Sequence, residues 1–168
     1  MTSPRRSTSR LLLRRVAMDD LAAFVALETT LRALEEPPRD PPDAADSARY
    51  LAAFAQVWDE GELGYWTIVV HGRVAGFGGV QPKLWRGRRC WNLYYRLAPE
   101  FQGQGIATET AREAIAAGFD DHPDWPVLVE TRPWNTGAIK VAERAGLVRQ
   151  AAQPDDDYAV LLLERPSP

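Results

Sequence analysis

The feature that most constrains this chain is a glycine-rich turn over residues 102–107, Gln-Gly-Gln-Gly-Ile-Ala, which joins an apolar run to a helical pattern. Two glycines at a strand-to-helix junction let the backbone approach a ligand without an intervening Cβ. The first N–H groups of the following helix have no acceptor within the helix, and they carry the positive end of its dipole. The sequence therefore predicts a phosphate-binding site at this turn.

Two common phosphate loops fit the turn poorly. A P-loop requires a Lys-Ser or Lys-Thr pair after its last glycine, and no glycine of the chain is followed by such a pair. A Rossmann fingerprint matches Gly103 and Gly105, but Thr108 stands where its third small residue should be. The turn also follows several strands instead of the first one. A nucleotide-binding oxidoreductase is therefore retained only as a rival hypothesis.

A third pattern, Q/R-x-x-G-x-G/A, is satisfied at Gln102, Gly105 and Ala107. It resembles the acetyl-CoA loop of the GNAT superfamily of N-acetyltransferases, and the continuation through Glu109 resembles its Rim-type branch, which contains the ribosomal-protein N-terminal acetyltransferases. Residues 127–147 resemble the second GNAT motif, a strand followed by a helix. In that helix Asn135 suits the N-cap and Gly146 the C′ position.

The order of elements agrees with this resemblance. Periodicity predicts helices from Asp19 or Asp20 to Leu34 and from Asp43 to Asp59, with Tyr50 on the buried face of the second. The predicted strands and helices follow the order β-α-α-β-β-β-α-β-α-β-β. We therefore expect an α/β (α+β) GNAT fold with a mixed, mostly antiparallel sheet of about seven strands and about four helices. The predicted strands cover residues 9–16, 65–70, 74–80, 89–97, 148–153 and 158–163, together with the strand that opens the second motif. The last two strands are expected to form a terminal hairpin across Pro154-Asp155-Asp156.

Two connections are also predicted. His71-Gly72 indicates a hairpin, and Pro82 to Arg88 reads as a basic connection. Residues 9–168 are expected to form a single acetyltransferase domain after a disordered basic tail, residues 1–8.

Composition narrows the function classes. The formal charge is −3, and the arginines near the start of the chain are better explained by a solvated tail than by a nucleic-acid arm. One cysteine, Cys90, excludes an internal disulfide framework and offers no zinc cluster. Neither a signal peptide nor a membrane-spanning run is visible. We expect a cytoplasmic protein with no metal and no membrane or nucleic-acid partner, and a homodimer stays open.

The resemblance implies acetyl-CoA as cosubstrate and assigns residues to it. The pyrophosphate would be held by backbone N–H groups of Gln102, Gly103, Gln104, Gly105, Ile106, Ala107 and Thr108. The pantetheine arm would pair with the main chain of Tyr95, Arg96 and Leu97. In the family a backbone N–H here, that of Leu97, polarises the thioester, and one such donor is worth ~3 kcal/mol. Asn135 would touch the cofactor, cap its helix, or do both.

The chain departs from the family where a general acid is usual. Many members have Tyr seven positions after the motif asparagine, and the Rim-type branch often has Ser three positions after it; here these are Ala142 and Ala138. Tyr94 could replace the acid or could be an ordinary core tyrosine. Glu130 is the carboxylate in the strand of the second motif, so it is the candidate base, although its alternation could place it on the wrong face.

The sequence thus predicts acetyl transfer from acetyl-CoA to a primary amine by direct attack. The acceptor could be a protein or peptide N-terminus or a small-molecule amine. An α-amino group (pKa ~8) is partly neutral at pH 7, whereas lysine (~10.4) is almost wholly charged, so an enzyme without a strong base should favour the former. The alternative is a catalytically weak or inactive acyl-CoA-binding module of the same fold.

Overall fold

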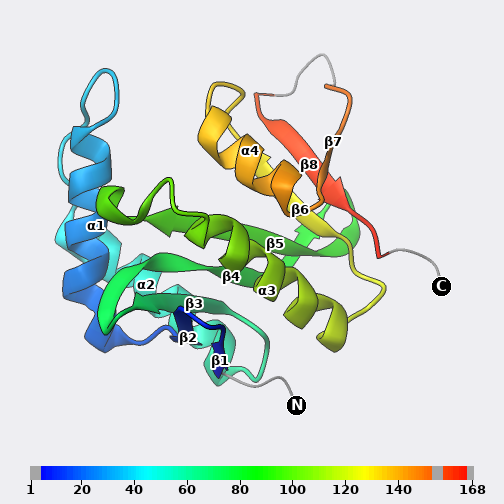
Figure 1. The fold of residues 1–168 in the computed structure, drawn as a ribbon, viewed down its shortest axis with the longest axis horizontal. Coiled ribbons are helices and arrows are strands. Elements are labelled where there is room, and N and C mark those ends of the chain that lie inside the picture. Colours follow the sequence, from blue (N-terminus) through cyan, green and yellow to red (C-terminus); the bar gives the residue numbers. More distant parts are fainter. Residues whose placement is uncertain (1–4, 153–156, 166–168) are drawn as a thin grey trace.

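The computed structural model describes residues 5–152 and 157–165, and its main feature is one open sheet (Figure 1). The sheet has eight strands among the described residues, in the order β1-β2-β3-β4-β5-β6-β8-β7. The strands are β1 (Arg5–Ser7), β2 (Leu11–Arg15), β3 (Tyr65–Val70), β4 (Arg73–Trp85), β5 (Arg88–Leu97), β6 (Val127–Thr131), β7 (Val148–Arg149) and β8 (Ala159–Leu163). Every neighbouring pair is antiparallel except β5 and β6.

Four helices flank the sheet in the described part of the chain: α1 (Leu21–Ala33), α2 (Ala44–Asp59), α3 (Ile106–Asp121) and α4 (Thr136–Arg144). Two short 3-10 turns, Met18–Asp20 and Pro99–Phe101, precede α1 and the glycine-rich turn. The predicted fold class is confirmed, with one strand more than expected. No helix in the described residues is long and apolar enough to cross a membrane.

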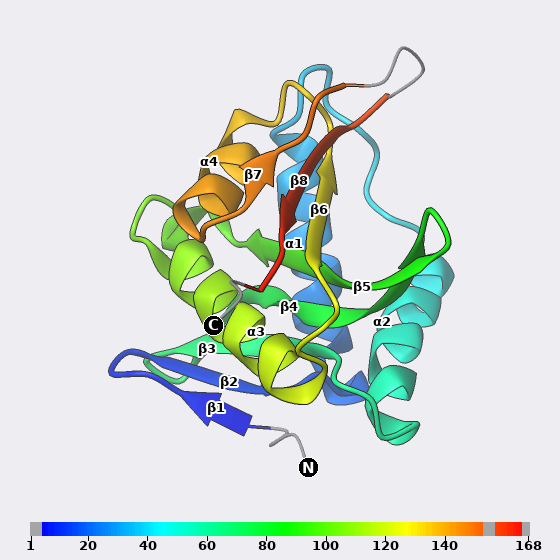
Figure 2. The same cartoon turned by 90° about the vertical axis from the view of Figure 1, so that its right-hand side faces the viewer.

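The helices cover the two faces of the sheet in pairs, α1 with α2 and α3 with α4 (Figure 2). Successive side chains of β5 alternate between these faces. Trp91 packs against Gly118 of α3, where an added Cβ would lie 3.0 Å from the indole. Tyr94 instead contacts Phe54 of α2 at a ring separation of 5.8 Å. Odd-numbered residues of β5 therefore face α3 and α4, and even-numbered residues face α1 and α2.

The N-terminal segment does not behave as predicted. Arg5–Ser7 forms β1, which pairs with β2 in the register Arg5↔Arg14 to Ser7↔Leu12. The expectation of a disordered tail is therefore wrong for this stretch, while residues 1–4 lie outside the described part. The charges that indicated a tail are paired, because Arg6 contacts both Glu113 and Asp120 of α3.

The predicted connection from Pro82 to Arg88 is also wrong. β4 continues through Pro82 to Trp85 and turns at Arg86-Gly87, whose positive φ values of 50° and 77° suit a two-residue hairpin. Proline is tolerated there because β3 pairs with β4 only as far as Gly79, so β4 is an edge strand on that side. The hairpin predicted at His71-Gly72 is confirmed by φ values of 47° and 76°.

Asp20 precedes α1 but does not cap it through its side chain. Its carboxylate is buried and accepts hydrogen bonds from Arg14 at 2.6 and 2.9 Å, from the Thr67 hydroxyl at 2.7 Å and from the Ala17 N–H. Asp20 thus fastens the start of α1 to β2 and β3. The second helix begins as predicted, because the Asp43 side chain accepts the N–H groups of Ala45 and Asp46.

Two smaller expectations have mixed outcomes. Tyr50, predicted on the buried face of α2, is 63% exposed, whereas Leu51 and Trp58, predicted on the same face, are buried. The predicted terminal hairpin is present as the pair β7 and β8, although β7 is only two residues long. The turn predicted at Pro154-Asp155-Asp156 lies outside the described residues.

Candidate active site

The site begins where β5 and β6 part. The two strands pair only at Trp91↔Val127 and Asn92↔Leu128, although β5 continues to Leu97 and β6 to Thr131. The Trp91 N–H donates to Pro126 on the β6 side, and the Ala98 N–H donates to Ala75 on the β4 side. By alternation, the N–H groups of Tyr95 and Leu97 point into the opening between β5 and β6. This exposed edge can accept an extended ligand as a further strand.

The glycine-rich turn lies beyond the end of β5. Gly103 and Gly105 have φ values of 72° and 78°, and Gly105 is the N-cap of α3. The Gln102 side chain donates to the Leu97 carbonyl at 3.0 Å, which ties the turn to the strand. The turn therefore presents the helix N-terminus to the space beside β5, as the sequence predicts.

A cavity of about 610 Å³ occupies this space, between the end of β5, the turn, and α4. Ten of the eleven predicted cofactor-binding residues line it: Tyr95, Arg96, Leu97, Gln102, Gly103, Gly105, Ile106, Ala107, Thr108 and Asn135. Gln104 does not, because its side chain turns away and donates to the Glu100 carbonyl.

The sequence analysis missed the contribution of α4 to the cavity. Four residues of this helix are spaced i, i+3, i+4 and i+7 and therefore share one helix face. All four line the cavity: Gly137, Lys140, Val141 and Arg144. This periodicity is visible in the sequence, but it indicates only that the four residues share a helix face, and not that this face lines a cavity. Lys140 and Arg144 add positive charge to a wall that already holds the N-terminus of α3.

The comparisons with known proteins agree with this geometry. A family model described as an acetyltransferase (GNAT) domain matches residues 10–148. The chain belongs to the GNAT family. A search of curated proteins finds no match.

Solved structures with the same fold include an acetyltransferase from Agrobacterium tumefaciens, at 23% identity and a TM-score of 0.80, covering 98% of this chain and 96% of that one. A protein from Bordetella pertussis, described as of the GNAT family, has 24% identity and a TM-score of 0.78, with 98% and 100% covered. RimL, a ribosomal L7/L12 α-N-protein acetyltransferase solved with coenzyme A, has 17% identity and a TM-score of 0.72, with 94% of each chain covered. At these identities the likeness concerns the fold.

In this GNAT cavity α4 is held against β5 by Tyr95. The Tyr95 hydroxyl donates to the Ala138 carbonyl at 2.6 Å, and burial raises the pKa of this phenol. Asn135 lines the cavity and also caps α4, because its side-chain oxygen accepts the Ala138 N–H at 3.2 Å. Ala142 is fully buried at the position where many GNAT proteins have tyrosine.

The two candidate catalytic side chains both lie on the opposite, α1–α2 face of the sheet. Tyr94 packs between Phe54 and Tyr65, and burial raises the pKa of its phenol. Glu130 forms an ion pair with Lys83 of β4. Neither residue lines the 610 Å³ cavity. They do belong to the two strands that border the opening, Tyr94 to β5 and Glu130 to β6.

On this face an ion pair with a buried carboxylate joins α1 to β5. Glu28 of α1 is 8% exposed and lies 3.0 Å from the Arg96 guanidinium and 3.9 Å from that of Arg32. Glu35, from the acidic loop after α1, lines the cavity and pairs with Arg39, which lowers the pKa of its carboxyl. Glu35 thus brings its charge to the cavity already paired.

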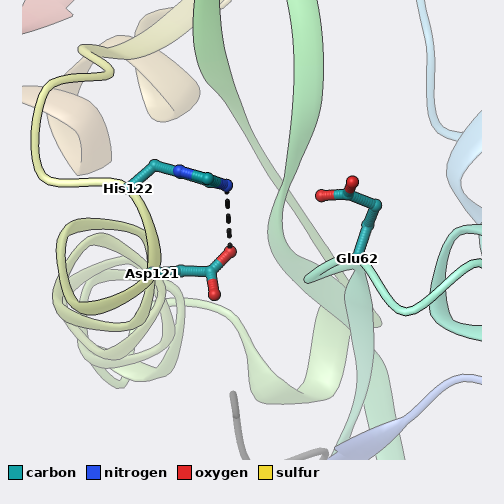
Figure 3. Close-up of side chains that lie close together, drawn as sticks. All are labelled: Glu62, Asp121 and His122. Atoms are coloured by element: carbon teal, nitrogen blue, oxygen red, sulfur yellow. Dashed lines mark ion pairs between the residues drawn. The ribbon is translucent and has the colours of Figure 1, made fainter.

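Metal-ligating side chains gather at another place. Glu62, which follows α2, approaches Asp121 and His122 at the end of α3, with one donor atom of each within 4.8 Å of the others (Figure 3). His122 Nε2 lies 3.8 Å from the Asp121 carboxylate, and the imidazole stacks on Trp125. None of the three lines the GNAT cavity.

Proposed function

We propose that this protein transfers an acetyl group from acetyl-CoA to a primary amine, and that the acceptor is the α-amino group of a protein or peptide. The observation that carries the proposal is the continuity of three elements. The free edge of β5, the N-terminus of α3 and the basic face of α4 line one cavity. An extended chain that ends in phosphates fits such a cavity.

The residues present fit coenzyme A group by group. The main chain of Tyr95 and Leu97 offers hydrogen-bonding groups to the two amides of a pantetheine arm. The first N–H groups of α3, from Ile106 onward, have no helical acceptor and suit a pyrophosphate. Lys140 and Arg144 place two cations beside these phosphates. Bound there, acetyl-CoA supplies an activated acetyl thioester.

The protein's own part in the reaction is then mainly electrostatic. The N–H groups of Tyr95 and Leu97 both point into the opening; while one pairs with the pantetheine arm, the other would donate to the thioester oxygen as negative charge develops on it. The amine would approach from the α1–α2 face, attack the acetyl carbon and lose its proton as the carbon–sulfur bond breaks. We assign the proton acceptor to Glu130 and the proton donor for the thiolate to Tyr94. Their position on the two strands that border the opening supports both assignments.

The choice of an α-amino acceptor rests on the cavity lining, which among the described residues contains one carboxylate, Glu35, already paired with Arg39. An α-amino group is partly neutral near pH 7 without help, unlike the lysine side chain. RimL, which shares the fold, is an α-N-protein acetyltransferase, and this agrees with the proposal. We further propose that the protein acts in the cytoplasm and without a metal.

A thiol-release assay with acetyl-CoA and a panel of peptides and small amines tests the proposal. We expect release of coenzyme A with peptides, and mass spectrometry should place the acetyl group on the N-terminal amine. Acetylation confined to lysine side chains would overturn the choice of acceptor. Coenzyme A binding without turnover of any acceptor would instead support the acyl-CoA-binding module. If NAD but not coenzyme A raises the melting temperature, the oxidoreductase hypothesis gains.

A further inference from the structure

The N-terminal hairpin of β1 and β2 is joined to α3 by a row of polar contacts. Arg6 donates to Glu113 and Asp120, and Thr8 and Arg10 both donate to Glu109. Glu109, Glu113 and Asp120 are spaced i, i+4 and i+11, so they share the face of α3 that is turned to the hairpin. Figure 2 shows this hairpin and α3 side by side. The contact at Glu109 lies within the first turn of the helix, directly beside the glycine-rich turn.

Arg10 reaches past Glu109 to the turn itself. Its Nε donates to Glu109 at 2.6 Å, while its Nη1 donates to the main-chain carbonyl of Gln104 at 2.8 Å. Its Nη2 lies 3.3 Å from the position that a Cβ on Gly105 would occupy. Arg10 does not line the cavity, whereas Gly105 does. The guanidinium therefore holds the turn from its outer side.

This hold fixes the direction of one peptide unit. In a planar trans peptide the carbonyl and the following N–H point in opposite directions. Because Arg10 holds the Gln104 carbonyl on the outer side, the Gly105 N–H of the same peptide points toward the cavity. Glycine crosses between positive and negative φ at little cost, so this peptide could otherwise rotate. Rotation would turn a carbonyl oxygen toward a bound phosphate.

From these contacts we infer that Arg10 is a positioning residue for the phosphate-binding turn, and that Glu109 and Thr8 orient its guanidinium. The inference rests on the proposed function, since the ligand of the turn is taken to be the pyrophosphate of coenzyme A. Arg10 acts on this ligand through the Gln104–Gly105 peptide and does not touch it. This role of Arg10 gives Glu109 a second function. Besides its favourable position near the positive end of the α3 dipole, Glu109 orients the Arg10 guanidinium.

The experiment compares Arg10→Met with Arg6→Met. Both variants remove a guanidinium that pairs with carboxylates of α3, but only Arg10 contacts the turn. Calorimetry with coenzyme A should give a dissociation constant raised about tenfold for Arg10→Met, the effect of losing one hydrogen bond from a charged group. Arg6→Met should stay within about twofold. Melting temperatures of both variants establish that they are folded.

A second measurement separates the turn from general stability. Acetyl-pantetheine carries the thioester but no phosphate, so its kcat/KM should be the same for Arg10→Met and wild type, while that of acetyl-CoA falls. Any of three results would overturn the inference and leave the proposed function standing. They are an equal loss of kcat/KM with both donors, an equal loss of coenzyme A affinity in both variants, and an unchanged coenzyme A affinity in Arg10→Met. Failure of the wild-type protein to bind coenzyme A would overturn the proposed function itself.

Discussion

The two faces of β5 are built in different ways. On the α3–α4 face, the cavity depends on main-chain groups and on residues from two short stretches, 95–108 and 135–144, with Leu31 and Glu35 added from the α1 side. On the α1–α2 face, the polar groups are paired across long separations: Arg96 with Glu28, Asn92 with Tyr65, and Glu130 with Lys83. The first face suits a ligand that is the same for a whole family. The second suits one that differs among its members.

The proposed division gives the donor to the first face and the acceptor chemistry to the second. A variant of the α1–α2 face should then change turnover or stability without changing the affinity for coenzyme A. A variant of the α3–α4 face should do the reverse. The two faces meet at the opening between β5 and β6, where Leu31, Glu35 and Arg96 from the α1 side also line the cavity. Single substitutions away from these three residues can therefore break the division.

The largest effect is expected for Tyr94→Phe. If the phenol protonates the leaving thiolate, its loss should lower kcat about a hundredfold. Burial raises the pKa of Tyr94, so the proton is present throughout the neutral range. Steady-state kinetics and calorimetry should show this fall with an unchanged dissociation constant for coenzyme A.

Tyr50→Phe provides the matched control, because Tyr50 lies on α2 with 63% of its surface exposed. It should leave kcat unchanged. A kcat for Tyr94→Phe within twofold of wild type would make Tyr94 a packing residue only, and it would remove the proposed proton donor from the α1–α2 face.

Asp20→Asn should have the next largest effect, on stability alone. Burial favours the neutral carboxyl, but the hydrogen bonds from Arg14, Thr67 and the Ala17 N–H outweigh burial and lower the pKa of Asp20. The substitution should lower the free energy of unfolding by about 2 kcal/mol at pH 7. Because Asp20 fastens α1 on the acceptor side, the affinity of the folded variant for coenzyme A should not change.

The pH dependence of this loss has a definite sign. A carboxyl whose pKa is lowered by folding stabilises the protein above its unfolded pKa, about 4, and this contribution is lost as the pH falls through the lowered value. Denaturation of wild type and Asp20→Asn should therefore differ most above about pH 5 and converge in acid. If the free energies of unfolding of the two proteins differed by the same amount down to pH 2, the stabilisation by Asp20 would not depend on its charge.

The contrast between the faces also explains what could be predicted from the sequence. The turn at 102–107, the cap at Asn135 and the strand before the turn are local patterns, and the structure brings them to one cavity. The partners of Glu28, Lys83 and Asp20 are set by tertiary packing, which no spacing in one sequence reveals. The start of the first helix was therefore predicted at Asp19 or Asp20, without the contacts of Arg14 and Thr67 to the Asp20 carboxylate.

The N-terminal error has the same cause. A basic run without visible periodicity indicates a solvated tail, but the carboxylates that pair with Arg6 and Arg10 lie more than 90 residues away on α3. Likewise Pro82 indicates a break, and only the early end of β3 shows why a strand can contain it. The sequence therefore predicted the residues of the cavity that lie close together in the chain, and it did not predict ion pairs between distant segments.

Gly105→Ala tests the donor side, with a smaller effect. Alanine at a φ of 78° is strained by about 1–2 kcal/mol. Relief of this strain would reorient the N–H groups of the turn and raise the dissociation constant for coenzyme A about tenfold. Gly72→Ala is the control, because Gly72 has a φ of 76° in the β3–β4 hairpin, away from the cavity.

Both variants should lose similar stability, and only Gly105→Ala should lose affinity. The kcat at saturating acetyl-CoA should be retained in each. An equal affinity loss in Gly72→Ala would show that global strain, and not the turn, limits binding.

The smallest effect is expected at the basic face of α4. Lys140→Met and Arg144→Met should each raise the dissociation constant for coenzyme A about threefold, the size of a solvent-exposed charge interaction. Added salt screens such pairs, so the difference from wild type should disappear at high ionic strength. Arg49→Met, at an exposed position of α2 paired with Asp46, supplies a control of equal charge change. If the threefold effect persisted in high salt, packing of the aliphatic stems would explain it, and the α3–α4 face would bind its ligand by the main chain alone.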